Sequence, residues 1–392
     1  MERPRARARS HWPNAAVDSG RRLIYDGVVH ATIETEVQGF IRNCWYVAAW
    51  DDDVPADGLF SRTLLGESVL LYRTDTGRVV ALENRCCHRG APLHLGRREG
   101  DCVRCMYHGM VFDPSGRCVE VPGQDSVPPH ARVTTYPVVV RDELVWIWMG
   151  DPSLADPNQT ISYWWHTDPG WRKQKATLHY DAPYSLIVDN LLDFSHLSFV
   201  HENTIGTPSI AGTRARIEPI DGGLRITRWY LNDQIQPSRA GIATFTGPAD
   251  RWQVYDWIAP SFLLLHTGAA PAGTGAPEGT LVPETMQYRH CSVQTPETES
   301  TTHYFFSHAH NFKLDDPNVT DVVFGGVHRA FIEDKVIIEA QQQALKLGRP
   351  LQPVGMAHDA AMLRARALIQ KMLDAEAHTS HQAEVVRATA AD

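Results

Sequence analysis

Short apolar runs alternate with turn residues from about residue 38 to about residue 152. The runs are rich in Val, Leu, Tyr and Trp, and Gly, Asp, Pro or Thr separates them in pairs, which is the pattern of β-hairpins. The sequence predicts three hairpins here: residues 68–73 with 78–83, 110–112 with 117–121, and 135–140 with 144–149. Gly150-Asp151-Pro152 then interrupts the pattern, so we expect a compact all-β domain over residues 38–152.

The pattern changes after residue 152, where longer apolar and aromatic runs are mixed with stretches of helical period. Strands are expected at residues 178–187, 214–231, 242–245, 252–267, 285–293 and 301–308. Residues 316–340 and 357–375 repeat apolar side chains with the period of a helix. Residues 268–279 are rich in Gly, Ala and Pro and predict a loop. We therefore expect a second, mixed domain over residues 153–375.

The two ends of the chain carry no such pattern. Residues 1–37 begin with an Arg-rich segment that no apolar stretch follows, so we expect a disordered arm and no secretory signal. Residues 376–392 are Ala-rich and polar, and we expect them to fray. No apolar run approaches the ~20 residues of a membrane span. The net charge of −9 argues against nucleic acid or an anionic membrane as a partner.

Cysteine and histidine are concentrated between residues 86 and 118. The seven cysteines are odd in number and mostly crowded there, which is typical of a metal site in a reducing compartment such as the cytoplasm. Residues 86–88 (Cys-Cys-His) and 105–108 (Cys-Met-Tyr-His) each present one thiol and one imidazole. Such a set suits a [2Fe–2S] cluster with two thiolates on one iron and two imidazoles on the other. A structural zinc site that combines Cys102 and Cys105 with Cys86 or Cys87 is the alternative.

The segments CCHRGAPLHLG and CMYHG, followed by the turn DPSG, together resemble the Rieske iron–sulfur domain. The resemblance implies a [2Fe–2S] cluster with four ligands: Cys86, His88, Cys105 and His108. Respiratory-chain Rieske proteins have an additional Cys in each loop and a Ser after the second His-Gly, where this sequence has Ala91, Tyr107 and Met110. Fewer hydrogen bonds should then reach the cluster. Its potential should lie toward the lower part of the range of about −150 to +300 mV, as in the oxygenase branch.

Residues 189–201, DNLLDFSHLSFVH, form a second informative stretch. Asn190, Asp193 and His196 are three apart, so a helix would align them as a polar stripe on an otherwise apolar, buried surface. Such a stripe is costly unless it binds something or is fully hydrogen-bonded. His201 can join His196 at one metal only if the helix ends or bulges between them. The facial triad of non-haem iron oxygenases is one interpretation, and a buried polar helix with satisfied histidines is the other.

The motif N-x-x-D-x-x-H-x-x-x-x-H resembles the catalytic-iron segment of Rieske oxygenases. The resemblance implies that His196 and His201 bind a mononuclear Fe(II). The family takes its third ligand from a C-terminal helix with the pattern F-x-E-D, which implies Asp334, with the adjacent Glu333 as the competitor.

The same resemblance gives the remaining polar residues of this stretch a catalytic role. Asp193, with Asn190 as a second candidate catalytic residue, would bridge His196 to His108 of a neighbouring subunit, so that electrons cross between subunits. Head-to-tail contacts of this kind must close into a ring of subunits. We expect this ring to be a homotrimer.

The resemblance covers residues 38–375 and is nearest to the vanillate O-demethylase group, through CWYVA (44–48), EVPGQ (120–124) and TPET (295–298). It implies an α+β fold, in which an all-β Rieske domain precedes a catalytic domain with an antiparallel sheet flanked by helices. It also implies a terminal oxygenase that uses O2 to hydroxylate or O-demethylate an aromatic substrate, which we expect to be an aromatic acid. Because no GxGxxG nucleotide motif is present, electrons from NAD(P)H should arrive on a separate reductase or ferredoxin.

An acidic substrate needs a cationic or hydrogen-bonding partner, for which His290 and Arg289 are candidates. A solvated position on an edge strand is the alternative for both residues. Two other functions stay open at this point. One is the α-subunit of a cis-dihydroxylating dioxygenase, which retains both oxygen atoms. The other is a zinc-stabilised binding protein without redox chemistry.

Overall fold

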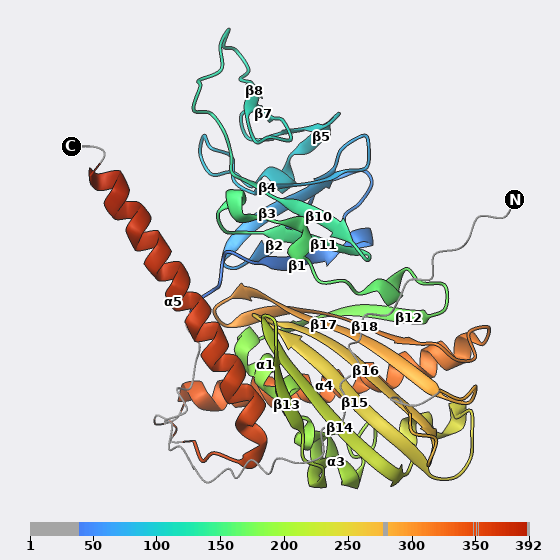
Figure 1. Cartoon of the computed structure of the whole chain (residues 1–392). Coiled ribbons are helices and arrows are strands. Elements are labelled where there is room, and N and C mark those ends of the chain that lie inside the picture. Colours follow the sequence, from blue (N-terminus) through green and yellow to red (C-terminus); the bar gives the residue numbers. More distant parts are fainter. Residues whose placement is uncertain (1–38, 277–280, 348, 350, 352, 390–392) are drawn as a thin grey trace, which may run out of the picture.

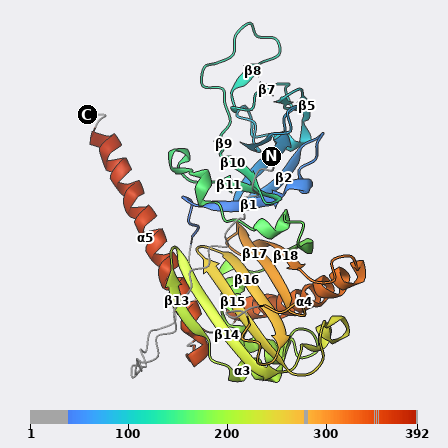
Figure 2. The same ribbon diagram turned by 45° about the vertical axis from the view of Figure 1, so that its right-hand side comes forward.

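Two β-rich bodies lie one above the other in the computed structural model, which describes residues 39–276, 281–347, 349, 351 and 353–389 (Figure 1). The upper body contains small sheets, and the lower body contains one large sheet with the helices. Figure 2 shows the same two bodies from a second direction. The α+β fold predicted from the sequence is confirmed. The predicted N-terminal arm, residues 1–37, lies outside the described residues.

The upper body consists of eleven short strands in three sheets, ordered β1-β11-β10, β2-β3-β4-β9 and β5-β6-β7-β8. Their bounds are β1 Trp45–Trp50, β2 Phe60–Leu64, β3 Glu67–Arg73, β4 Val79–Glu83, β5 Arg97–Glu99, β6 Cys102–Arg104, β7 Val111–Phe112, β8 Cys118–Glu120, β9 Thr135–Tyr136, β10 Val138–Arg141 and β11 Leu144–Trp148.

The three predicted hairpins are present as β3–β4, β7–β8 and β10–β11. The strand expected at residues 135–140 is divided in two at Pro137, because proline has no N–H to donate to a ladder. As a result β9 pairs with β4 in one sheet, whereas β10 pairs with β11 in another. The break lets one segment of chain join two sheets.

The lower body contains seven strands and five helices. The strands are β12 Arg172–Tyr180, β13 Arg216–Ile220, β14 Gly223–Asp233, β15 Ala249–Ile258, β16 Phe262–Pro271, β17 Met286–Thr298 and β18 Thr301–His310. The helices are α1 Tyr184–Leu192, α2 Leu197–Val200, α3 Pro208–Gly212, α4 Pro317–Leu347 and α5 Ala360–Thr389. The 3-10 helices of the described residues are η1 Asp51–Asp53, η2 Leu93–Leu95, η3 Pro152–Leu154, η4 Pro157–Gln159, η5 Trp164–His166, η6 Phe194–His196, η7 Pro237–Ile242 and η8 Ala357–Asp359.

The seven strands form one antiparallel sheet in the order β12-β18-β17-β16-β15-β14-β13. Helix α4 packs against β12 and β18, and α1 packs against β17. Side chains alternate between the two faces, as the period of a strand requires. On β18, Tyr304 and Phe306 join the core on the helix side with Phe331 of α4, whereas Phe305 between them points to the other face.

The other face of this sheet packs directly on the upper body. Trp146 and Trp148 of β11 form one buried cluster with Phe262, Val293 and Phe305 of the large sheet. Backbone hydrogen bonds between the segments 65–66 and 296–297 extend this contact. The two bodies therefore share a hydrophobic core, which fixes their relative orientation.

Two predicted strands differ from those in the structure at their boundaries. The strand expected at residues 178–187 begins earlier, at Arg172, and ends at Tyr180, and Pro183 then starts α1. The single strand expected at residues 214–231 is a hairpin, β13–β14. Its turn contains Gly222 with a positive φ of 66°, a conformation that favours glycine.

Two further predictions were wrong. Residues 242–245 do not form a strand: the 3-10 helix η7 ends at Ile242, which packs against Met286 and Tyr288. Residues 268–279 do not form a loop throughout, because β16 continues to Pro271. A Cβ atom on Gly268 would lie 2.0 Å from the Trp252 ring, so this small residue lets the strand pass beneath the indole.

Both predicted C-terminal helices are present and extend beyond their predicted ends, as α4 and α5. The prediction that the chain frays from residue 376 is wrong, since α5 continues to Thr389. The Glu376 carboxylate accepts hydrogen bonds from the backbone N–H groups of Arg42 (2.9 Å) and Asn43 (2.6 Å), which ties α5 to the segment before β1. No helix of the described part of the chain is long and apolar enough to cross a bilayer.

Replacing Gly268 with Ala should destabilise the protein, because the added methyl group meets the Trp252 ring at 2.0 Å. Overpacking of this kind costs about 1–3 kcal/mol or more, which thermal unfolding would report as a melting temperature several degrees lower. Gly212→Ala is the matched control, because a Cβ atom there meets nothing within 4 Å. Equal melting temperatures for the two variants would contradict this packing.

Candidate active site

The segment that carries the predicted metal ligands is a broken helix. Helix α1 ends at Leu192, and Asp193 leaves the helical conformation with φ −123° and ψ 94°. The Asp193 carboxylate then caps the 3-10 helix η6 by accepting hydrogen bonds from Ser195 N (2.8 Å) and Ser195 Oγ (2.9 Å). The single continuous polar stripe predicted through Asn190, Asp193 and His196 is therefore wrong. The break lies at Asp193, and α2 then ends at the cap residue His201.

This break brings two imidazoles to one carboxylate of α4. Asp334 Oδ1 lies 3.1 Å from His201 Nε2 and 3.3 Å from His196 Nε2. One ligand atom from each of these three residues lies within 4.8 Å of the other two. The three side chains predicted from distant parts of the sequence thus meet at one point.

The outer nitrogens of both imidazoles have partners of their own. His196 Nδ1 donates to the carbonyl oxygen of Asp193 (2.5 Å), and His201 Nδ1 donates to Glu333 Oε2 (2.7 Å). Each ring therefore donates its Nδ1 proton outward and turns Nε2 toward Asp334, where a metal ion would meet the Nε2 lone pair. Glu333 orients His201 from outside and does not join the three inner atoms, which makes Asp334 the better candidate for the third ligand.

The charges at this point suit a cation. Burial opposes ionisation of Asp334, which is 4% exposed, yet the nearby imidazoles of His196 and His201 lower the pKa of its carboxyl to about 2. His196 Nε2 is buried and has no hydrogen-bond partner among the described residues. A buried carboxylate, an unpartnered imidazole nitrogen and a second imidazole are the donor set of a divalent transition-metal site. The residues present therefore fit a metal ion.

A cavity of about 610 Å³ opens beside these three residues. Its walls are mostly apolar, with Leu263 and Leu265 from the sheet and Phe331 from α4. These apolar walls would pack the faces of an aromatic ring. Apart from Asn190 and the three metal-site residues, the polar lining lies on the sheet and on or beside η7, and consists of Gln236, Arg239, Gln253, Thr267, His290 and His308.

His290 and Arg289, the two residues considered for substrate contact, point in opposite directions from β17. His290 is buried and lines the cavity, and its Nε2 has no partner among the described residues. The Arg289 guanidinium lies over the rings of Trp164 and Trp171. Because β17 is an interior strand, the alternative of a solvated edge position is wrong for both residues.

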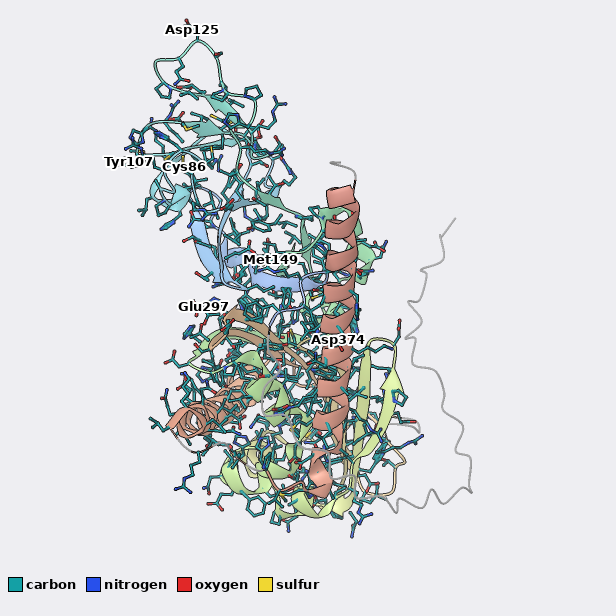
Figure 3. The ribbon with its side chains drawn as sticks, turned by 90° about the vertical axis from the view of Figure 1, so that its left-hand side faces the viewer. Cys86, Tyr107, Asp125, Met149, Glu297 and Asp374 are labelled. Carbon is teal, nitrogen blue, oxygen red and sulfur yellow. The ribbon has the colours of Figure 1, made fainter. Side chains whose placement is uncertain are left out.

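The other candidate ligands lie in two loops with the same backbone pattern. In the first, Gly90 N donates to the carbonyl oxygen of Cys86 (2.9 Å), and in the second Gly109 N donates to that of Cys105 (3.0 Å). Both glycines have a positive φ. Figure 3 shows these loops at the side of the upper body, where Cys86 and Tyr107 lie above Met149 and below the tip at Asp125.

These two loops bring like side chains together. Cys86 and Cys105 are buried, whereas the rings of His88 and His108 are exposed and lie 4.6 Å apart between centroids. Burial, with a contribution from the neighbouring Cys105 thiol, raises the pKa of Cys86 to about 11. A buried Cys86 thiol that resists ionisation on its own, beside a second buried thiol, suits a cluster whose positive charge would stabilise a thiolate.

The comparisons with known proteins agree with both sites. Residues 44–137 match the family described as "Rieske [2Fe-2S] domain", and residues 180–375 match "Vanillate O-demethylase oxygenase C-terminal domain". The iron–sulfur subunit of the toluene-4-sulfonate monooxygenase system of Comamonas testosteroni is 56% identical over 86% of this chain and 98% of its own. The chain belongs to the Rieske oxygenase components.

Other Rieske oxygenase components give the same result. The oxygenase component of dicamba O-demethylase of Stenotrophomonas maltophilia is 35% identical over 86% of this chain and 99% of its own. The crystal structure of dicamba monooxygenase bound to dicamba matches with a TM-score of 0.78 and 33% identity, over 87% of this chain and 100% of that chain. Membership of this family excludes the zinc-stabilised binding protein considered from the sequence.

Several polar residues of this Rieske oxygenase component were not predicted as site residues. Arg239 and Gln236 lie on or beside η7, in a stretch without recognisable periodicity, and no signal in the sequence points to them. His308 could have been found, because it is two residues beyond Phe306 on β18 and so shares its face of the sheet. Gln253 lines the cavity from β15, and this position could not be predicted because it depends on the register of β15 in the sheet.

Removing the two neighbouring carboxylates of α4 should have different effects on metal content. Asp334→Ala should leave the site unable to retain a metal ion, because it removes one of three inner donors. Glu333→Gln should still bind one metal ion at saturation, with an affinity about 10–100-fold lower, because it affects only the orientation of His201. Elemental analysis after anaerobic reconstitution and desalting measures the metal content of both variants. Full retention of metal in Asp334→Ala, with loss in Glu333→Gln, would mean that Glu333 is the metal ligand and Asp334 is not.

Proposed function

We propose that this chain is the terminal oxygenase of a multicomponent system that hydroxylates or O-demethylates an aromatic acid with O2 and with electrons from NAD(P)H. The observation that carries the proposal is the meeting of His196, His201 and Asp334 on the wall of an apolar cavity. Monooxygenation is the reaction favoured by the relatives, since those named for their activity on aromatic compounds are monooxygenases and demethylases.

The three inner residues are the proposed ligands of a mononuclear Fe(II), as a set of two histidines and one carboxylate. Iron held in this way supplies open coordination positions for O2. The surrounding residues keep the ligands in place: Glu333 accepts a hydrogen bond from His201, and Asn190 Nδ2 donates to Asp334 Oδ1 (3.1 Å). The apolar cavity walls would exclude water and pack the substrate ring.

The proposed substrate is an aromatic acid. Relatives are named for toluene-4-sulfonate and for vanillate, which are both aromatic anions. His290 is the proposed hydrogen-bonding contact with the substrate, because its unpartnered Nε2 lines the cavity. A cis-dihydroxylating dioxygenase would need the same metal site and is the alternative that product analysis must test.

The cluster is assigned to the upper body by its family match, and we propose Cys86, His88, Cys105 and His108 as its ligands. The proposed boundary between a cluster domain (38–152) and an iron domain (153–375) follows the change from β11 to the segment before β12. The seven cysteines are unbridged, which supports a cytoplasmic location. The names of the relatives, iron–sulfur subunit and oxygenase component, support a separate reductase or ferredoxin as electron donor.

We propose that the cluster of one subunit serves the iron site of the next. The cluster loops lie on the upper body, away from the large sheet, and the whole β1–β11 sheet and the shared core separate them from α4 (Figure 1). Exposed apolar side chains occur at both ends of the expected contact. Met106 and Tyr107 are 55% and 61% exposed beside the cluster ligands, and Phe199 and Val336 are 75% and 63% exposed beside the iron ligands.

A head-to-tail contact between these two ends must close into a ring, for which we propose a homotrimer. Asp193 is the proposed bridge within that contact. Its carbonyl oxygen already binds His196 Nδ1, and its carboxylate, 27% exposed, would accept a hydrogen bond from His108 of the partner subunit.

Product analysis with isotopically labelled O2 tests the proposed reaction. The protein would be supplied with NADH, a generic reductase and toluene-4-sulfonate or an aromatic carboxylate. We expect substrate-dependent NADH consumption and one labelled oxygen atom incorporated per turnover, in the alcohol formed from toluene-4-sulfonate or, in a demethylation, in the formaldehyde released. Two labelled atoms would favour the dioxygenase alternative. Protein that contains zinc in place of iron and consumes no NADH would contradict the proposal.

Asp193→Asn should leave both metal sites filled and reduce turnover by about 100-fold, because the neutral amide is a weaker acceptor than the carboxylate for His108 of the partner subunit, while the backbone carbonyl still accepts from His196. Electron spin resonance of the cluster and elemental analysis of iron verify the first part, and NADH-coupled turnover measures the second. Ser195→Ala is the matched control, since it removes one donor to Asp193 and keeps the carboxylate. Normal turnover in Asp193→Asn would reject the bridge.

A further inference from the structure

One buried charge in the cavity lining has no counter-ion among the described residues. A buried arginine is normally paired with a carboxylate, because an unpaired, desolvated guanidinium is costly. Arg251 follows this rule and lies 3.1 Å from Asp233 Oδ2. Arg239 is 7% exposed, and no carboxylate of the residues that the structure describes lies within ion-pair distance of it.

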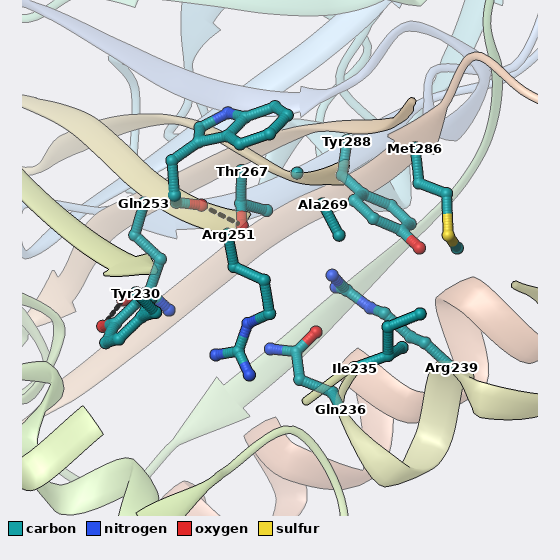
Figure 4. A pocket seen from close by; sticks show the side chains of 12 residues that line it. Tyr230, Ile235, Gln236, Arg239, Arg251, Gln253, Thr267, Ala269, Met286 and Tyr288 are labelled. Atoms are coloured by element: carbon teal, nitrogen blue, oxygen red, sulfur yellow. Dashed lines mark hydrogen bonds between the residues drawn. The ribbon is translucent and has the colours of Figure 1, made fainter. Parts of the chain in front are cut away.

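Neutral groups hold the Arg239 side chain in place. It extends from η7, and its guanidinium lies over the Tyr288 ring at 3.8 Å from the centroid. Arg239 Nη2 donates to His308 Nε2 (3.2 Å). Figure 4 shows the guanidinium between Tyr288 and Gln236, facing a second, smaller cavity of about 310 Å³. Arg239 is therefore fixed in position while its charge stays uncompensated.

The hydrogen bond from Arg239 also determines which protons its neighbours carry. A guanidinium can only donate, so His308 Nε2 must be the acceptor and His308 Nδ1 must carry the proton. That proton is donated to His290 Nδ1, which lies 3.3 Å away. His290 must then carry its own proton on Nε2, the nitrogen without a partner that lines the cavity.

Both imidazoles stay neutral in this arrangement. Burial, together with the charge of Arg239, lowers the pKa of His290 to about 3 and that of His308 well below its usual value. The polar end of the cavity therefore presents a cation and an imidazole N–H, both donors. A ligand group that matches two such donors is an oxyanion.

We infer that Arg239 is the counter-ion of the acid group of the substrate and selects aromatic anions over neutral rings. This inference rests on the proposed function and deepens it, because it assigns the recognition of the acid group to one residue. A sulfonate or carboxylate would accept hydrogen bonds from the guanidinium, and His290 Nε2–H would be a further donor in the same cavity.

The shape of the lining fits this assignment. Arg239, Gln236, Gln253 and Thr267 line both the large cavity and the smaller one, so the acid group would lie where the two meet. The aromatic ring would then pack against the apolar walls of the large cavity, beside His196, His201 and Asp334.

Calorimetric titration of the metal-loaded protein, without reductase, tests the inference. The probes are toluene-4-sulfonate and its neutral analogue 4-methylbenzenesulfonamide. Wild-type protein should bind the sulfonate at least about 30-fold more tightly than the sulfonamide. Arg239→Gln should weaken sulfonate binding by about 30-fold or more and leave sulfonamide binding within about 3-fold, and Arg239→Lys should recover part of the loss.

Arg225→Gln is the matched control. Arg225 lies on β14, is paired with Asp256 at 2.7 Å and lines neither cavity, so this variant should bind both probes like the wild type. Should Arg239→Gln fail to fold, the comparison of the two probes on wild-type protein and on Arg239→Lys still decides the question.

The outcomes separate this inference from the proposed function. Equal affinity of the wild type for sulfonate and sulfonamide, or unchanged sulfonate affinity in Arg239→Gln, would overturn the role of Arg239 and leave oxygenation untouched. Sulfonate binding that depends on Arg239, without any oxygenated product when reductase and O2 are supplied, would support the role of Arg239 and contradict the proposed function.

Discussion

The contact of the Asp334 carboxylate with His196 and His201 joins helix α4 to the broken helix that follows α1, and the site depends on both segments. A buried carboxylate is costly without a positive partner, and here burial and two imidazoles meet at a single oxygen. The broken helix after Leu192, the cap at Asp193 and the outer contact with Glu333 all serve to turn two ring nitrogens toward that oxygen. The same geometry that suits a metal ion therefore explains the irregular local fold.

The large sheet supports this contact on one face and carries the upper body on the other. One face packs against α1 and α4 and lines the cavity, and the opposite face shares a core with β1 and β11. Because the loops of Cys86 and Tyr107 lie on the upper body, away from the large sheet, this rigid docking would keep the proposed cluster apart from the proposed iron site of the same chain (Figure 3). The fold thus favours pairing between chains.

The elements that could be predicted from the sequence are those that depend on short motifs and on local periodicity. The two Cys-His loops, the three hairpins and α4 could be read from local patterns, whereas His196, His201 and Asp334 were implied as a set only by the resemblance to Rieske oxygenases. The break at Asp193 could not, because it depends on a capping bond with Ser195. The continuation of β16 through Gly268 depends on Trp252 in the neighbouring strand, and Arg239 belongs to the cavity only through the stacking of η7 on Tyr288. Such contacts between distant segments leave no periodic signal.

Complementation between two inactive variants tests the central claim most directly. Cys105→Ser removes a proposed cluster ligand, and Asp334→Ala removes a proposed iron ligand, so each variant alone should be inactive. If the cluster of one subunit serves the iron of the next, trimers assembled from an equal mixture should recover about a quarter of the wild-type rate. Mixed assemblies as inactive as either parent would contradict the account and would require a path within one chain.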